Sequence, residues 1–231
     1  MSGYRLLTSS LLLKIFIAMI NNMLDLLFSS PLLFFLFILG LVVAVTIHEF
    51  SHALAADKLG DPTPRLNGRL TLNPLAHLDP LGTLSLLIAR VGWGKPVPID
   101  PYNLARPRRD AALISLAGPG SNLILAFVLS LFIRVLPSPL LATLIVPIIT
   151  INVSLAIFNL LPVPPLDGAK ILIGFLPTEW GVELEENLSQ YGLLLLILVI
   201  FPFFGGTSLA EKLIFPVINL ILSFLLPFWM I

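Results

Sequence analysis

The sequence contains no cysteine, only three histidines, and charged residues at just 11% of its 231 positions. Without cysteine, disulfides and thiolate ligands are excluded, so a bound metal must use His, Asp or Glu. The 13 basic and 13 acidic residues balance, which leaves no net field to recruit nucleic acid. In contrast, 57% of the residues are hydrophobic and the mean hydropathy is +1.01. This composition predicts a membrane protein without a nucleic-acid partner.

Long runs without charged residues divide the chain into candidate membrane helices, since a spanning helix needs about 20 mostly apolar residues. They predict an all-α polytopic membrane protein in which residues 1–231 form a single domain. The first segment fits either a span or an interfacial helix, because Lys14 and several polar residues interrupt it. It lacks a signal-peptide cleavage pattern, so we expect it to be retained. The predicted spans are 6–28, 31–56, 111–134, 140–161, 188–205 and 209–231.

The one long polar stretch, residues 57–110, holds eight of the 13 Lys and Arg residues. The positive-inside bias therefore places it in the cytoplasm and predicts a multi-pass protein of the cell membrane. Its Pro and Gly spacing predicts a small β/loop insertion of short strands and turns, and the apolar piece 81–89 can return into the bilayer. The RPRR sequence at 106–109 favours a solvated anchor on anionic lipid.

The sequence HEFSH, residues 48–52, lies near the cytoplasmic end of the second predicted span. In a helix, His48 and His52 share one face and can ligate one metal, while Glu49 is offset to act as a general base on a water molecule. The alternative is a His and Glu network that joins helices. Because such groups are costly at membrane depth unless paired, metallated or hydrated, the cluster indicates function.

A zinc site with two His ligands needs a third protein ligand. Asp167, in NLLPVPPLDG, follows the span that returns to the depth of HEFSH, and its carboxylate suits zinc; alternatively, it caps the helix that begins near Ala169. Three prolines before it predict irregular backbone that lines a cavity. Asn159, one turn earlier, can donate to a developing oxyanion or bond another helix.

Three motifs in this order, HEFSH, AGPGSN (117–122) and NLLPVPPLDG, resemble the site-2 protease family of intramembrane zinc metalloproteases. TLNPLAHLDPLGT, GWGKPVP and GDPT resemble its compact prokaryotic branch, so we expect no PDZ or CBS domain. The resemblance implies one zinc ion held by His48, His52 and Asp167, with Glu49 activating water. It also implies that Asn159 steadies the substrate or the tetrahedral intermediate.

Other motif residues keep two interpretations each. Gly118 and its neighbours Pro119 and Gly120 favour close helix packing. Asn122 suits either the cavity or that packing. His77, in NPLAH, resembles a family motif near the active site, but a loop His that caps backbone is an equal alternative.

These patterns together predict a zinc metalloendopeptidase that cleaves the transmembrane segment of a single-span protein, as in regulated intramembrane proteolysis. The active site would face the cytoplasm, with lipid and a second copy of the chain as further partners. The alternative is a non-catalytic zinc-binding homologue or a transporter. Cobalt or iron would fit the same ligands. A rhomboid serine protease is excluded because GPGS has the wrong order, and a di-aspartyl protease because only Asp167 is well placed.

Overall fold

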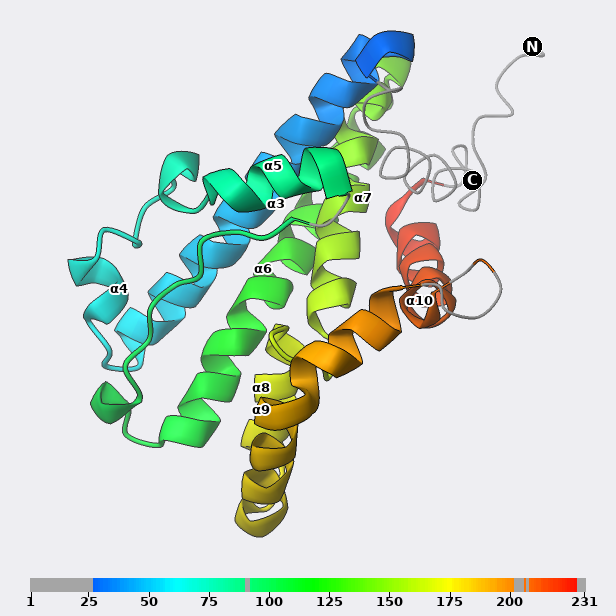
Figure 1. The fold of residues 1–231 in the computed structure, drawn as a ribbon. Coiled ribbons are helices and arrows are strands. Elements are labelled where there is room, and N and C mark those ends of the chain that lie inside the picture. The colour runs from blue at the N-terminus through cyan, green and yellow to red at the C-terminus, as the bar shows by residue number, and fades with distance from the viewer. Residues whose placement is uncertain (1–26, 90–91, 202–205, 207, 228–231) are drawn as a thin grey trace.

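The computed structural model describes residues 27–89, 92–201, 206 and 208–227. In this part of the chain the regular structure is helical, which confirms the predicted all-α class. Three long helices form its centre: α3 (Pro31–Lys58), α6 (Pro107–Val135) and α7 (Pro139–Asn159), each packed against the other two (Figure 1). The predicted span 6–28 lies almost wholly outside the described residues.

Within the described residues, α3, α6 and α7 are the helices long and apolar enough to cross a membrane. They correspond to the predicted spans 31–56, 111–134 and 140–161. Two further long helices lie nearer the C-terminus, α9 (Thr178–Ile200) and α10 (Leu209–Leu225). The first half of α9 is rich in Glu, and α10 has 17 residues, so the spans 188–205 and 209–231 and the total of six stay predictions.

Apolar packing joins the helices in three clusters. The largest lies between α6, α7 and α10 and includes Ile133, Ile149 and Leu222. A second joins α3 to α7 through Phe37 and Ile151.

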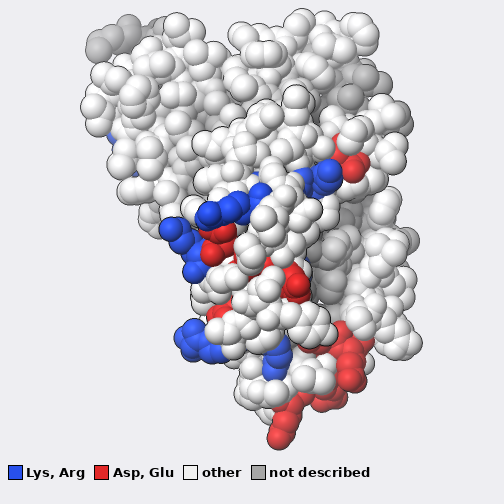
Figure 2. Space-filling view, turned by 90° about the vertical axis from the view of Figure 1, so that its left-hand side faces the viewer, with Lys and Arg blue, Asp and Glu red and all other residues white. Residues whose placement is uncertain are grey.

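The charged residues on the surface are unevenly distributed. Figure 2 shows Lys, Arg, Asp and Glu gathered over the lower part of one face, while its upper part is nearly free of them. This division is expected of a chain whose uncharged part lies in lipid and whose charged part lies in water, because charged side chains are costly in lipid.

The polar stretch 57–110 forms short helices rather than strands. These are α4 (Thr63–Leu66), η1 (Pro74–Ala76), α5 (Pro80–Ala89) and η2 (Pro101–Asn103). Among the described residues the predicted β part is reduced to one isolated bridge between Leu78 and Gly94. Prolines such as Pro96 and Pro98 remove the N–H groups that a strand ladder needs, which explains the difference. The apolar piece 81–89 is the helix α5.

Asp61 holds the two ends of this polar stretch together. Its buried carboxylate accepts hydrogen bonds from the Thr63 N–H at 3.0 Å, the Asp100 N–H at 2.8 Å and Asn103 Nδ2 at 2.9 Å. Although burial raises the pKa of Asp61, these hydrogen bonds together hold the pKa below its ordinary value. The carboxylate is therefore charged at neutral pH and anchors the stretch beside the end of α3.

The last element that positions the site is α8 (Asp167–Phe175), which follows the irregular turn after α7 and packs against α6. Arg108, in the first turn of α6, donates from Nη2 to the Ile173 carbonyl at 2.8 Å and from Nη1 to the Thr178 carbonyl at 3.2 Å. These bonds fix the far end of α8. The near end of α8, which begins with Asp167, is thereby directed towards α3.

Candidate active site

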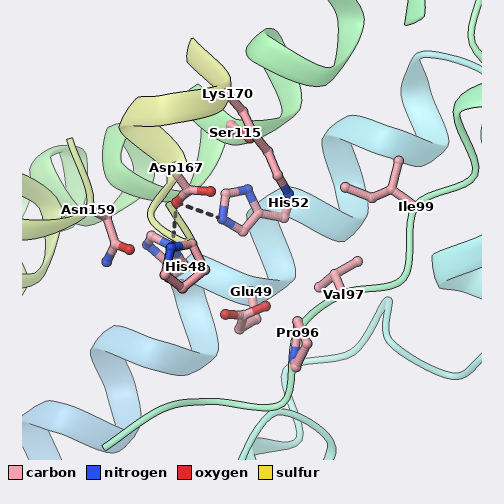
Figure 3. A pocket seen from close by; sticks show the side chains of 11 residues that line it. His48, Glu49, His52, Pro96, Val97, Ile99, Ser115, Asn159, Asp167 and Lys170 are labelled. Carbon is pink, nitrogen blue, oxygen red and sulfur yellow. Dashed lines mark hydrogen bonds and ion pairs between the residues drawn. The ribbon is translucent and has the colours of Figure 1, made fainter. Parts of the chain in front are cut away.

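His48 and His52 lie one turn apart on α3 and are both buried. Their rings meet edge to face, with centroids 4.5 Å apart and an interplanar angle of 89°. The Glu49 side chain, from the same turn, lines the cavity into which both imidazoles point (Figure 3). The helical spacing therefore gives the arrangement expected from HEFSH, with two nitrogen ligands beside one carboxylate.

Asp167 approaches both imidazoles from α8. Its Oδ2 atom lies 3.0 Å from His48 Nε2 and 3.2 Å from His52 Nε2 (Figure 3). Asp167 is the first residue of α8, and Leu166 occupies the cap position, so the alternative role as a helix cap is not what the structure shows. Residues 119 positions apart in the sequence thus converge on one point.

The other nitrogen of each imidazole is engaged by a buried acceptor. His52 Nδ1–H donates to the Ile114 carbonyl at 2.7 Å, and His48 Nδ1–H donates to Asn122 Oδ1 at 2.7 Å. The amide orientation of Asn122 follows from its donor side, because Nδ2 donates to the Ala44 carbonyl at 3.0 Å and to Asn152 Oδ1 at 2.7 Å. Both Nδ1 atoms therefore carry a hydrogen, and Nε2 is the nitrogen of each ring that faces Asp167.

These bonds leave the Nε2 atoms of His48 and His52 facing a carboxylate oxygen of Asp167. One ligand atom from each of the three residues lies within 4.8 Å of the other two, so the three atoms can bind one cation together. A tetrahedral zinc ion with bonds of about 2.0–2.1 Å separates its ligand atoms by about 3.3 Å. The observed distances of 3.0 and 3.2 Å are close to that spacing. The donor set therefore fits zinc, and the Nδ1 bonds supply the outer hydrogen bonds typical of metal-bound His.

Two glycines allow this convergence. A Cβ atom on Gly118 of α6 would collide with the Nε2 atom of His52 and lie 2.7 Å from Cε1 of His48. A Cβ atom on Gly168 would collide with the backbone carbonyls of Leu160 and Leu161, where the chain turns into α8. Gly118 lets α6 contact both rings, and Gly168 lets the backbone after α7 fold closely around Asp167.

The ligand set opens into a cavity of about 140 Å³. This volume holds several water molecules or a short piece of peptide besides an ion. One wall is the extended segment Pro96–Ile99 of the polar stretch, which faces Glu49 (Figure 3). Ser115, Asn159, Pro165 and Lys170 complete the lining.

Of the two residues proposed to bind substrate, the structure places one at the cavity and the other away from it. Asn159 lines the cavity, with its Nδ2 donating to the Leu155 carbonyl at 3.0 Å. His77 does not line it; the side chain is fully buried in the polar stretch, and its Nε2–H donates to the Thr71 carbonyl at 2.8 Å. A direct contact of His77 with substrate has no support from this placement, and the role of Asn159 stays a prediction.

Sequence reasoning missed several residues at the site. Asn122 was assigned to packing or to the cavity, whereas it supports His48. A buried amide in an apolar helix, four residues after Gly118, was the available signal, since polar groups there need a partner. The motif GWGKPVP contains Pro96 and Val97, but its residue types did not indicate that this segment lines the cavity, and Lys170 carried no distinguishing signature.

Comparison with known proteins gives the family. Residues 137–201 match the family model described as "Peptidase family M50". The "Putative zinc metalloprotease YwhC" of Bacillus subtilis is 38% identical over 192 residues, which cover 79% of this chain and 85% of that protein. The chain belongs to the site-2 protease family, peptidase family M50. This confirms the family resemblance of its motifs.

Two more relatives of this chain support its membership of the family. The "Putative zinc metalloprotease Rip2" of Mycobacterium tuberculosis (strain H37Rv) is 35% identical over 183 residues, 75% of this chain and 70% of that protein. The "Putative zinc metalloprotease MJ0611" of Methanocaldococcus jannaschii is 34% identical over 93 residues, 40% of this chain and 49% of that protein. No solved structure gives a significant match. By family and by its apolar helices, the chain is a membrane zinc metalloprotease.

Proposed function

We propose that this site-2 protease is an intramembrane endopeptidase that hydrolyses a peptide bond in or near the transmembrane helix of a single-span protein. The observation that carries the proposal is the convergence of His48, His52 and Asp167 beside Glu49 at a helix that is long and apolar enough to span a membrane. A metal-ligand set with an adjacent carboxylate matches hydrolytic chemistry, because ligation alone does not need Glu49 at that offset.

His48, His52 and Asp167 are the residues that would hold the zinc ion. The ion, when bound, would lower the pKa of water to about 7 and would polarise a carbonyl. Glu49 accepts a proton from the attacking water on a carboxylate oxygen and later gives it to the leaving amine. Asn159 offers its amide to the developing oxyanion. Asn122 and the Ile114 carbonyl hold the two imidazoles in the tautomer and orientation that ligation requires.

The cavity wall suggests how an unwound substrate is held. A helical substrate hides its amides in backbone hydrogen bonds, so it must unwind near the cleaved bond. In the described part of the chain, the backbone N–H and C=O groups of Val97 and Ile99 have no hydrogen-bond partner, and both residues line the cavity. They can pair with an extended peptide. We therefore propose substrates with Gly, Pro or Asn near the cut.

The distribution of charge supports a proposal for the orientation of the site. HEFSH lies in the last third of α3, next to the polar stretch that holds eight of the 13 Lys and Arg residues. Because basic loops stay in the cytoplasm, we propose a protein of the cell membrane with its active site towards the cytoplasmic side. This position gives water a short path to the metal.

Substitution of Glu49 by Gln tests the proposal. We expect the variant to keep its zinc and to lose cleavage of a single-span test protein in detergent or in vesicles, because Gln cannot take the proton. A zinc-binding homologue without catalysis, or a transporter, would show no cleavage before the substitution and would keep its own function after it. Undiminished cleavage by Glu49→Gln would contradict the role given to Glu49.

A further inference from the structure

Arg69 is a buried cation in the polar stretch, and the residue is only 4% exposed. Its guanidinium has no carboxylate partner among the described residues, whereas Arg65, four residues earlier, pairs with Asp57 at the surface. Its Nε–H is also buried without a partner in that part of the chain. A buried charge without a paired carboxylate is costly, so stability alone does not explain this placement.

The guanidinium instead joins two separate segments of the polar stretch. Nη1 donates to the carbonyl of Ala76, in the NPLAH turn. Nη2 donates to the carbonyl of Lys95 and, at 2.8 Å, to that of Pro96. The Lys95 N–H donates to the His77 carbonyl at 2.8 Å, which completes the connection between the two segments. Arg69 therefore fixes the start of the cavity wall Pro96–Ile99 from behind.

The hydrogen-bonded connection between these two segments lies against the turn of α3 that carries Glu49. A Cβ atom built on Gly94 would lie 3.3 Å from Cγ1 of Val45 and 3.7 Å from Oε1 of Glu49. Burial lowers the pKa of Arg69, and the negative charge of Glu49 acts in the opposite direction. The wall that Arg69 holds thus begins beside Glu49.

We infer that Arg69 is a positioning residue for the protease reaction: by binding three backbone carbonyls it holds the wall Pro96–Ile99 at the distance from Glu49 that an unwound substrate needs. This inference rests on the proposed function. Arg69 touches neither substrate nor metal, and acts through the backbone of the wall. The fork geometry of its guanidinium is essential, because a Lys ammonium at this place cannot reach three carbonyls in two segments.

Enzyme kinetics test this role with Arg69→Lys, which keeps the charge and loses the fork. The probe is a single-span test protein with Gly-Pro at the cytoplasmic end of its helix. We expect KM to rise about tenfold while kcat stays within about twofold and zinc content is unchanged. The matched control is Arg65→Lys, for which both constants should stay at the parent values. Unchanged KM in Arg69→Lys, or a loss of zinc with a fall in kcat, would overturn the inference.

Two further measurements keep the test independent of any one variant. Gly94→Ala perturbs the segment just before the wall without altering Arg69, because its Cβ would lie 3.2 Å from the His77 carbonyl oxygen and 3.3 Å from Cγ1 of Val45, and we expect KM to rise. The chain has no cysteine, so spin labels can be placed at Phe35→Cys and Lys95→Cys, both exposed side chains. Position 35 lies about 21 Å along α3 from Glu49.

The distance distribution between the two labels should broaden in Arg69→Lys and stay narrow in Arg65→Lys. An equally narrow distribution in both would overturn the inference even if KM rises. If the unsubstituted protein cleaves no test protein, the proposed function fails, while the spin-label distances still decide whether Arg69 holds the wall.

Discussion

Asn122 Oδ1 lies 2.7 Å from His48 Nδ1, at a point where both side chains are buried. The amide belongs to α6 and the imidazole to α3, and Asn152 of α7 holds the other end of the amide at 2.7 Å. Three helices thus fix the direction of one of the rings that would bind the metal. The buried amide thus has a role at the metal site, because the hydrogen-bond partner of a His ligand sets the tautomer and the ring orientation of that His.

Asn122→Ala should weaken zinc binding without removing a ligand. The substitution leaves the Nδ1–H of His48 without its acceptor, and loss of such an outer partner typically costs about 10–100-fold in metal affinity. Competition with a chelator of known affinity measures the change. Asn187→Ala, at an exposed position of α9, is the control and should bind zinc as the parent does. Equal affinity in Asn122→Ala would show that the amide does not support the site.

Gly118→Ala should abolish or severely weaken zinc binding, although it adds one methyl group. That methyl would collide with His52 Nε2 and lie 2.7 Å from His48 Cε1, so the rings must leave their positions. Gly120→Ala provides a matched control on the same helix, since a Cβ there meets no atom within 4 Å. Metal analysis of both purified variants measures the effect. Full zinc content in Gly118→Ala would mean that the rings do not lie against α6.

Asp61→Asn should destabilise the polar stretch in a pH-dependent way. The folded pKa of Asp61 is lowered, so its stabilisation is present above the unfolded pKa of about 3.9 and is lost as pH falls through the folded value. Near pH 7 we expect a loss of about 1–3 kcal/mol in the free energy of unfolding, because buried donors lose a charged acceptor.

The measurement for Asp61 is thermal unfolding of parent and Asp61→Asn from pH 7 to pH 3. The difference in Tm should be largest at neutral pH and should shrink on acidification. Glu185→Gln, an exposed substitution on α9, controls for the loss of one negative charge. A difference in Tm that is constant with pH would contradict the account of Asp61.

The sequence predicted the parts of this structure that depend on local spacing and on membrane topology. HEFSH placed two imidazoles on one helix face, and the charge-free runs predicted α3, α6 and α7. The return of the chain along the span 140–161, now α7, also predicted that Asp167 reaches the depth of HEFSH, and the structure brings its Oδ2 atom to 3.0 Å from His48 Nε2. These features follow from helical periodicity and from bilayer thickness.

The parts that sequence reasoning did not predict depend on contacts between distant segments. The polar stretch forms helical turns around Arg69 and Asp61 rather than short strands, and proline positions alone do not determine which carbonyls meet a guanidinium. Asn122 reads as a packing residue until its neighbour on α3 is known. His77 resembles a site residue by motif, yet tertiary folding buries it outside the cavity.

The most direct test of the central claim is the metal content of purified full-length protein, compared with that of Asp167→Ala. We expect one zinc ion per chain in the parent and a loss of most of it in Asp167→Ala, since His48 and His52 alone leave the ion short of a ligand. Circular dichroism should show that the variant keeps its helices. Zinc bound equally well without the Asp167 carboxylate would contradict the three-residue site.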